Sequence, residues 1–236
     1  MHHPEGRAAP GAGSSGEGPA RGRSEDPGLR LDAVVLAGGR ASRLGGADKP
    51  ALVVGERSLV ASVTSAAADA GARLVIVVGP PRPGLVLARG RLLVVREEPH
   101  GSGPVPALRR GLAEVTAPWV LVLAADLPFI RAGHLGSLLA AAAGARQGVG
   151  AVLADDTGRP QWLAGCWPTE TLRAASSGYR GGSLRGLLGP LAPVMVGPAP
   201  GQPGPPPWLD CDTEDDVRRA RAWPGDRAGR GPGVTR

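Results

Sequence analysis

The sequence predicts an α/β fold: one domain of three layers, with a mostly parallel sheet between two layers of helices. Short Val-rich apolar runs alternate with segments of helical character, and the connections between them are short. The run Trp119–Ala124 is continuously apolar, which is typical of a central strand covered on both faces. The length of 236 residues is sufficient for one such domain with a sizeable core.

The expected elements follow one another from residue 31. We expect strands at Leu31–Leu36, Arg73–Val78, Arg91–Val95, Trp119–Ala124, Val149–Ala154, Gln161–Trp167, Pro193–Val196 and Trp208–Asp212. We expect helices from Ser58 to Ala70, at Pro104–Val115, His134–Ala143 and Ser183–Leu188, and after Thr213. Ser58 and Thr213 have the side chains of helix N-caps, and Gly71 suits the end of the first helix. A turn at Asp156–Gly158 makes the strands around it a hairpin.

The chain divides into a domain at residues 29–223 and two tails. Residues 1–28 are rich in Gly, Pro, Ser and Arg and nearly lack large apolar residues, so we expect them to be disordered. Gly11–Gly16 matches G-x-G-x-x-G, but no strand precedes it and no helix follows, which excludes a dinucleotide loop. Residues 224–236 form a basic C-terminal tail. The Pro/Gly-rich segment Gly197–Pro207 is expected to be exposed.

The net charge of +6 does not point to nucleic acid. The excess lies in residues 218–236, which carry six arginines and one aspartate, and the domain shows no basic stripe or aromatic platform. Two cysteines without CxxC spacing exclude a typical structural zinc site. With no membrane-spanning run and no apolar signal core, we expect a cytoplasmic monomer with reduced thiols.

The most informative stretch is the glycine-rich loop at residues 36–50, LAGGRASRLGGADKP, which leaves the first strand. Backbone N–H groups of Gly38 and Gly39 are free of a Cβ and suit an anion. Arg40, Arg43 and Lys49 add three cations, so the loop suits a polyphosphate, although a solvated basic turn is the alternative. Lys49 is the single lysine beside 26 arginines, which favours a site that requires a compact ammonium.

This loop resembles the signature LAGGxSxRxGxDK of nucleotidyltransferases, most closely that of the molybdenum cofactor guanylyltransferases and their cytidylyltransferase relatives. The resemblance implies a Rossmann-like nucleotidyltransferase domain in which the loop holds the triphosphate of GTP or CTP. It implies Arg43, Lys49 and Asp126 as catalytic residues. The nucleotide-binding residues that we expect are Leu36, Ala37, Gly38, Gly39, Arg43, Lys49, Gly79, Glu98 and Asp126.

Two carboxylates are candidate magnesium ligands. Asp126 comes directly after the strand Trp119–Ala124, at the edge of the sheet where the loop also begins, and Mg²⁺ is commonly shared between carboxylate and phosphate. Capping of the turn at Pro128 is the alternative. Asp210 and Asp212 alternate on one expected strand. The stretch resembles the family's DxDT element, which implies Asp212 as a second Mg²⁺ ligand; capping of the last helix is the alternative.

Two other segments are less typical of the family. Glu97-Glu98 and Gly103-Pro104 resemble the acidic pair and GPLAG turn, but the chain has GPVPA. The chain also contains no Asn. A contact that the family makes through Asn must therefore be made here by another residue or be missing, and Gly79 stands where that contact is expected. For the phosphorylated acceptor we expect Gln161, Arg180, Ser183 and Arg185, because a helix start between guanidinium groups suits a terminal phosphate; an exposed helix start is the alternative.

The sequence therefore predicts a Mg²⁺-dependent enzyme that transfers NMP from an NTP, with GTP favoured, to a phosphorylated acceptor and releases pyrophosphate. The resemblance implies that the acceptor is molybdopterin carrying molybdenum. A different sugar- or alditol-phosphate acceptor with CTP is the alternative within this class. A non-catalytic nucleotide-binding protein of the same fold, and a nucleic-acid module built on the basic tail, are alternatives from other classes.

Overall fold

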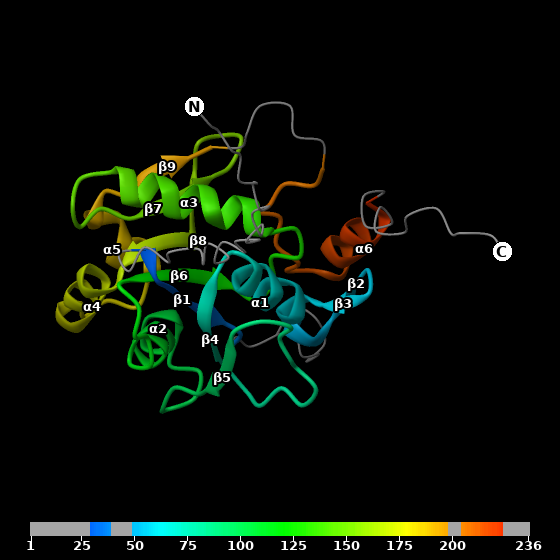
Figure 1. The fold of residues 1–236 in the computed structure, drawn as a ribbon. Coiled ribbons are helices and arrows are strands. Elements are labelled where there is room, and N and C mark those ends of the chain that lie inside the picture. The colour runs from blue at the N-terminus through cyan, green and yellow to red at the C-terminus, as the bar shows by residue number, and fades with distance from the viewer. Residues whose placement is uncertain (1–28, 39–48, 198–203, 224–236) are drawn as a thin grey trace, which may run out of the picture.

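The computed structural model describes residues 29–38, 49–197 and 204–223. These residues fold into three layers, with a seven-stranded sheet between two layers of helices (Figure 1). Its strands are β1 (Leu31–Leu36), β4 (Ala72–Val78), β5 (Arg91–Val95), β6 (Trp119–Ala124), β7 (Ala151–Ala154), β8 (Pro160–Pro168) and β9 (Val194–Val196). The order across the sheet is β5-β4-β1-β6-β8-β7-β9. Only β8 runs antiparallel to its neighbours in this sheet, so the predicted mostly parallel α/β fold is confirmed.

Five of the described helices cover the two faces of this sheet: α1 (Leu59–Asp69), α2 (Pro104–Leu112), α3 (Ala132–Gly144), α4 (Thr169–Gly178) and α5 (Leu184–Leu188). Helix α6 (Glu214–Ala222) instead packs in a small third cluster with Val54 and Phe129. Alternation along β1 places Ala33 and Val35 against α1 and α3 on one face, and Val34 and Leu36 against α2, α4 and α5 on the other. Each helix thus buries an apolar face, and two cores form around one sheet. None of the described helices is long and apolar enough to cross a membrane.

Local signals identified several elements correctly. Ser58 caps α1 through its Oγ, which accepts from the N–H of Ala61 at 3.3 Å, and Gly71 follows the helix with φ of 99°. Thr213 caps α6 in a reciprocal box with Asp216. The predicted hairpin is formed by β7 and β8. Helix α2 ends at Leu112, three residues earlier than expected.

Other predictions were wrong. Residues Trp208–Asp212 form no strand, because the N–H of Leu209 turns back to the carbonyl of Pro206 at 3.1 Å. Pro207 is buried, not exposed. Helix α4 and a small hairpin made of β2 (Val53–Val54) and β3 (Arg57–Ser58) were not predicted.

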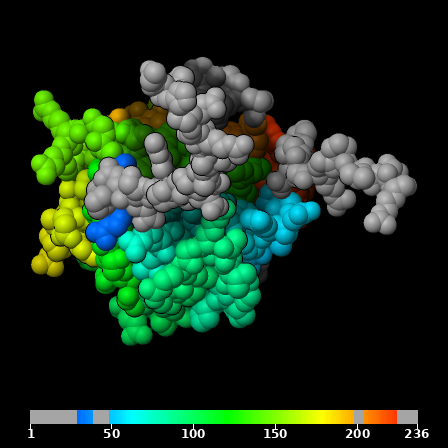
Figure 2. All heavy atoms as spheres, in the orientation of Figure 1, coloured from blue at the N-terminus to red at the C-terminus, as the bar shows by residue number. Residues whose placement is uncertain are grey.

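Several predictions concern residues outside those described, which are drawn in grey (Figure 2). These are the two tails, residues 198–203 of the Pro/Gly-rich segment, and residues 39–48 of the glycine-rich loop with Gly39, Arg40 and Arg43. The proposed roles of these residues stay predictions.

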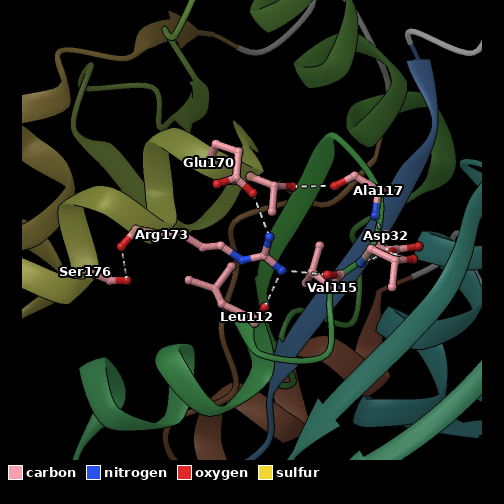
Figure 3. A network of polar contacts seen from close by, with 9 residues as sticks. Asp32, Leu112, Val115, Ala117, Glu170, Arg173 and Ser176 are labelled. Carbon is pink, nitrogen blue, oxygen red and sulfur yellow. Dashed lines mark hydrogen bonds and ion pairs between the residues drawn. The ribbon is translucent and has the colours of Figure 1, made fainter.

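A polar network ties the loops at the amino-terminal edge of the sheet (Figure 3). The buried carboxylate of Asp32 accepts from the N–H groups of Leu74, Thr116 and Ala117 at 2.8 to 3.2 Å. Arg173 in α4 donates to the carbonyls of Leu112 and Val115 at 3.0 and 2.6 Å. Asp32 is thus satisfied by backbone donors, and its role is structural.

Candidate functional site

The site lies at the carboxyl ends of three adjacent parallel strands, β4, β1 and β6. Leu36 pairs with Val78 on one side and with Ala124 on the other, so the segments that follow these strands begin side by side. The N–H of Ala37 donates to the carbonyl of Val78 at 2.8 Å, and the N–H of Ala125 donates to that of Leu36 at 3.1 Å. This edge is where ligands bind in open α/β sheets.

Lys49 joins two carboxylates at this edge. It begins a short 3-10 turn, Lys49–Ala51, and its Nζ lies 2.5 Å from Oδ2 of Asp126. The same ammonium also contacts Oδ1 of Asp212. The side chains of Lys49 and Asp126 are 16% and 22% exposed, and that of Asp212 is 52% exposed. The structure thus brings together three residues that the sequence analysis named.

The C-terminal segment is what carries Asp212 to this place. The N–H of Cys211 donates to the carbonyl of Asp126 at 3.3 Å, and the buried Cys211 side chain packs in a small cluster with Val54 and Phe129. Helix α6 is fixed to the β2–β3 hairpin by Arg221, whose Nε donates to the carbonyl of Val53 at 2.9 Å. Tertiary packing, and not the expected strand, therefore places Asp212 beside Asp126.

The charges at the site influence one another. Burial acts to lower the pKa of Lys49, but the attraction and hydrogen bonds of Asp126 and Asp212 prevail and raise this pKa above 10.5. Lys49 therefore stays charged at neutral pH. Desolvation by the surrounding chain, together with Asp212 and Asp126, raises the pKa of the Asp210 carboxyl. Burial likewise raises the pKa of both thiols, Cys166 and Cys211, to about 12, so neither is a ready nucleophile.

Asp126 and Asp212 fit a divalent cation, because both carboxylates already converge on one cationic group. Within the described ranges no group of three or more His, Cys, Asp or Glu side chains forms a complete metal cage. Two carboxylates are nevertheless the usual protein share of a Mg²⁺ site, since substrate phosphates and water supply the other oxygen atoms. The two carboxylates would therefore suit a cation that takes its other oxygen ligands from phosphate and water.

Glu97, and not Glu98, is the member of the acidic pair that lies beside the loop. Glu98 is exposed, whereas Glu97 is 7% exposed. Oε1 of Glu97 accepts from the N–H of Gly101 at 2.9 Å and lies 3.9 Å from where a Cβ would stand on Gly38. Its buried Oε2 has no hydrogen-bond partner among the described residues. The sequence showed the acidic pair after β5 but contained no signal for which member faces inward.

Gly79 and Arg82 both contact the start of the glycine-rich loop. A Cβ on Gly79 would lie 2.8 Å from the carbonyl oxygen of Ala37, so this position accepts no side chain without displacement of the loop. Nη2 of Arg82 donates to that same oxygen at 3.1 Å. Of these two residues, Gly79 was predicted from the sequence and Arg82 was not.

The predicted acceptor residues lie on β8 and around the start of α5. The amide of Gln161 donates to Asp155 at 3.1 Å, and Oγ of Ser183 accepts from the N–H of Gly186 at 3.1 Å as the cap of α5. Arg180 and Arg185 are exposed near that cap. Their assignment to an acceptor stays a prediction.

The chain is similar to known proteins over most of the described sheet. A family model described as "MobA-like NTP transferase domain" matches residues 33–194. A relative from Trichormus variabilis named "Probable molybdenum cofactor guanylyltransferase" is 39% identical over 43% of this chain and 48% of the relative. The chain thus spans about half the length of that relative. One from Mycobacterium avium with the same name is 30% identical over 68% of this chain and 81% of the relative.

A solved structure has a similar fold. It is titled as a complex of Rv0371C from Mycobacterium tuberculosis with manganese, and it covers 81% of this chain and 97% of its own with a TM-score of 0.58 and 20% identity. The match of the family model, at the residues that form the sheet and its carboxyl edge, shows that this chain belongs to the MobA-like NTP transferase family.

Proposed function

We propose that this protein is a Mg²⁺-dependent nucleotidyltransferase that moves GMP from GTP to a phosphorylated acceptor of the molybdopterin type and releases pyrophosphate. The observation that carries the proposal is the convergence of Lys49, Asp126 and Asp212 at the end of the sheet where the loop begins. Membership of the family and the names of the relatives support the reaction and the acceptor class.

The chain's own residues position and neutralise the reacting groups. The loop amides and Lys49 bind the triphosphate, and Asp126 and Asp212 would hold the divalent cation. When bound, that cation would neutralise phosphate charge and help align donor and acceptor. An ionised oxygen of the acceptor phosphate attacks the α-phosphorus, and pyrophosphate leaves. The reaction needs no covalent intermediate with the protein, so positioning and charge neutralisation supply the catalysis.

A similar protein supports the metal assignment. The manganese complex of Rv0371C shows that a protein with this fold binds a divalent cation. Manganese and magnesium both accept carboxylate and phosphate oxygens, so Mn²⁺ is a suitable probe for the site.

Glu97 supports guanine as the base. Guanine presents adjacent N–H donors at N1 and the 2-amino group, whereas cytosine presents one amino donor beside acceptors. A carboxylate with a buried unpartnered oxygen next to the nucleotide loop is suited to two adjacent donors. We therefore favour GTP over CTP at this site.

A nucleotide panel tests the proposal. Melting temperatures are measured with each NTP in the presence of Mg²⁺, since a ligand at 100 times its Kd stabilises by about 2.7 kcal/mol. We expect the largest shift with GTP, and pyrophosphate release only when a molybdopterin-type acceptor is added. A preference for CTP would favour the cytidylyltransferase alternative. Binding of GTP without turnover on any acceptor would favour a non-catalytic nucleotide-binding protein.

A further inference from the structure

Arg82 lies in the segment between β4 and β5 and reaches back to the start of the nucleotide loop. It is half-buried, and its Nη2 donates to the carbonyl oxygen of Ala37 at 3.1 Å. In Figure 2 the segment between β4 and β5 forms part of the teal front of the molecule. Ala37 is the first residue after β1 and is buried, whereas Gly38, the next residue, is exposed. The contact thus falls where the chain leaves the core and enters the loop.

The peptide group between Ala37 and Gly38 is restrained from several directions. The preceding peptide group is fixed to the sheet, because the N–H of Ala37 donates to the carbonyl of Val78 at 2.8 Å. Gly79 approaches the Ala37–Gly38 peptide group so closely that a Cβ there would lie 2.8 Å from the carbonyl oxygen of Ala37 and 2.9 Å from its carbonyl carbon. The donor to this carbonyl oxygen is the guanidinium group of Arg82, three residues after Gly79.

The geometry of the peptide bond gives this contact a consequence for the ligand. A trans peptide is planar, and its C=O and N–H groups point in opposite directions. When Arg82 holds the carbonyl of Ala37, it therefore also fixes the direction of the Gly38 N–H, which points away from the Arg82 side. That N–H is one of the loop amides assigned to the triphosphate.

We propose that Arg82 is a positioning residue, which orients the Gly38 N–H toward the bound nucleotide by holding the carbonyl of Ala37. This inference rests on the proposed function, because it assumes that the loop binds an NTP.

The segment has other contacts that hold it in place. Leu85 and Leu87 pack against the core beneath α1, and the N–H of Leu85 donates to the carbonyl of Arg82 at 3.2 Å. These contacts do not involve the guanidinium group of Arg82. We therefore expect loss of the guanidinium group to affect nucleotide binding far more than folding.

The test compares Arg82→Met and Arg82→Lys with Arg89→Met, a control at an exposed arginine of the same segment. Nucleotide affinity is measured by calorimetric titration with Mg-GTP, followed by KM and kcat for GTP and for the acceptor. We expect Arg82→Met to raise the Kd and KM for GTP about tenfold, as for the loss of a charge-assisted hydrogen bond. The KM for the acceptor and the melting temperature should stay near the wild-type values. Arg82→Lys should recover part of the affinity, and Arg89→Met should bind like the wild type.

The outcomes separate this inference from the proposed function. If the wild-type protein binds no NTP, the proposed function is wrong and Arg82 has no nucleotide to position. If the wild type binds GTP and Arg82→Met and Arg82→Lys both bind it equally well, only the inference is overturned. If Arg82→Met does not fold, Arg82→Lys decides. A folded lysine variant whose Kd for Mg-GTP equals that of the wild type overturns the inference, and so does an equal fall in affinity for GTP and for the acceptor.

Discussion

The ammonium of Lys49 lies 2.5 Å from Oδ2 of Asp126, although 77 residues separate the two in the chain. Asp212 contacts the same ammonium from a third segment. One ammonium group therefore contacts both carboxylates that we assign to the metal. Since an ammonium and a divalent cation attract the same carboxylates, we expect them to compete in the absence of a triphosphate.

The first prediction follows from this competition. Lys49→Ala should bind Mn²⁺ severalfold more tightly than the wild type when no NTP is present, because the competing cation is gone. The same variant should bind GTP more weakly and turn it over more slowly, because Lys49 neutralises the triphosphate. Titration of the nucleotide-free proteins with Mn²⁺, followed by electron paramagnetic resonance, measures the first effect.

Controls make this prediction specific. Asp126→Asn should lose Mn²⁺ affinity instead of gaining it. Equal Mn²⁺ affinity in Lys49→Ala and the wild type would contradict the competition, and unchanged GTP affinity and activity would remove Lys49 from the phosphate site.

The second prediction concerns the base. Glu97→Gln should weaken GTP binding and leave CTP binding nearly unchanged, because an amide accepts fewer hydrogen bonds than a carboxylate from the two donors of guanine. Glu98→Gln, at the exposed neighbour, is the matched control and should bind both nucleotides as the wild type does. A parallel loss of GTP and CTP affinity in Glu97→Gln would show that Glu97 only supports the loop.

The third prediction concerns the turn between β7 and β8. Oδ1 of Asp155 accepts from the N–H groups of Thr157 and Arg159, each at 2.9 Å, and from the hydroxyl of Thr157 at 2.7 Å. The hydrogen bond with Thr157, followed by that with Arg159, lowers the pKa of Asp155 below 3.8. The stabilisation by the charged group is thus present above pH 3.8 and is lost as the pH falls through the lower folded-state pKa.

We therefore expect Asp155→Ala to lower the melting temperature at pH 7, and the difference from the wild type to shrink as the pH falls below about 3.8. Thermal melts across this pH range measure the effect. Asp156→Ala, at the exposed neighbour, is the control. A difference in melting temperature that grows toward acid pH would show that the sign of the linkage is wrong.

The sequence predicted the sheet well because each strand of the core is specified locally. The run WVLVLA is apolar on both faces, and LDAVVL is apolar except for Asp32; they became β6 and β1 with their predicted bounds. The stretch Trp208–Asp212 looked equally strand-like, but three prolines precede it, and its buried residue, Cys211, packs against α6 and Phe129 instead of joining a sheet. Such a tertiary contact leaves no periodicity in the sequence.

Only those site residues that follow directly from a locally specified strand could be predicted with their position. Asp126 follows its strand at once, so its place at the carboxyl edge could be predicted. Asp212 was chosen for a strand alternation that does not exist, yet the contact of Cys211 with Asp126 brings it to the site. Which of Glu97 and Glu98 turns inward, and that Arg82 reaches Ala37, depend on how the segments cross in space, and no local pattern encodes this.

The central claim is that Asp126 binds the metal, and the variant Asp126→Asn tests it most directly. This change keeps the size of the side chain and removes the charge that attracts a hard cation.

Pyrophosphate release and melting temperature are measured on the same preparation at saturating Mg²⁺. The account predicts that turnover falls about a hundredfold or more, as when one well-placed electrostatic group is lost. The melting temperature should change little, because a partly exposed ion pair with Lys49 contributes only about 0–1 kcal/mol. A protein destabilised by about 1 kcal/mol, as for a lost turn cap, with near-normal pyrophosphate release would contradict the account.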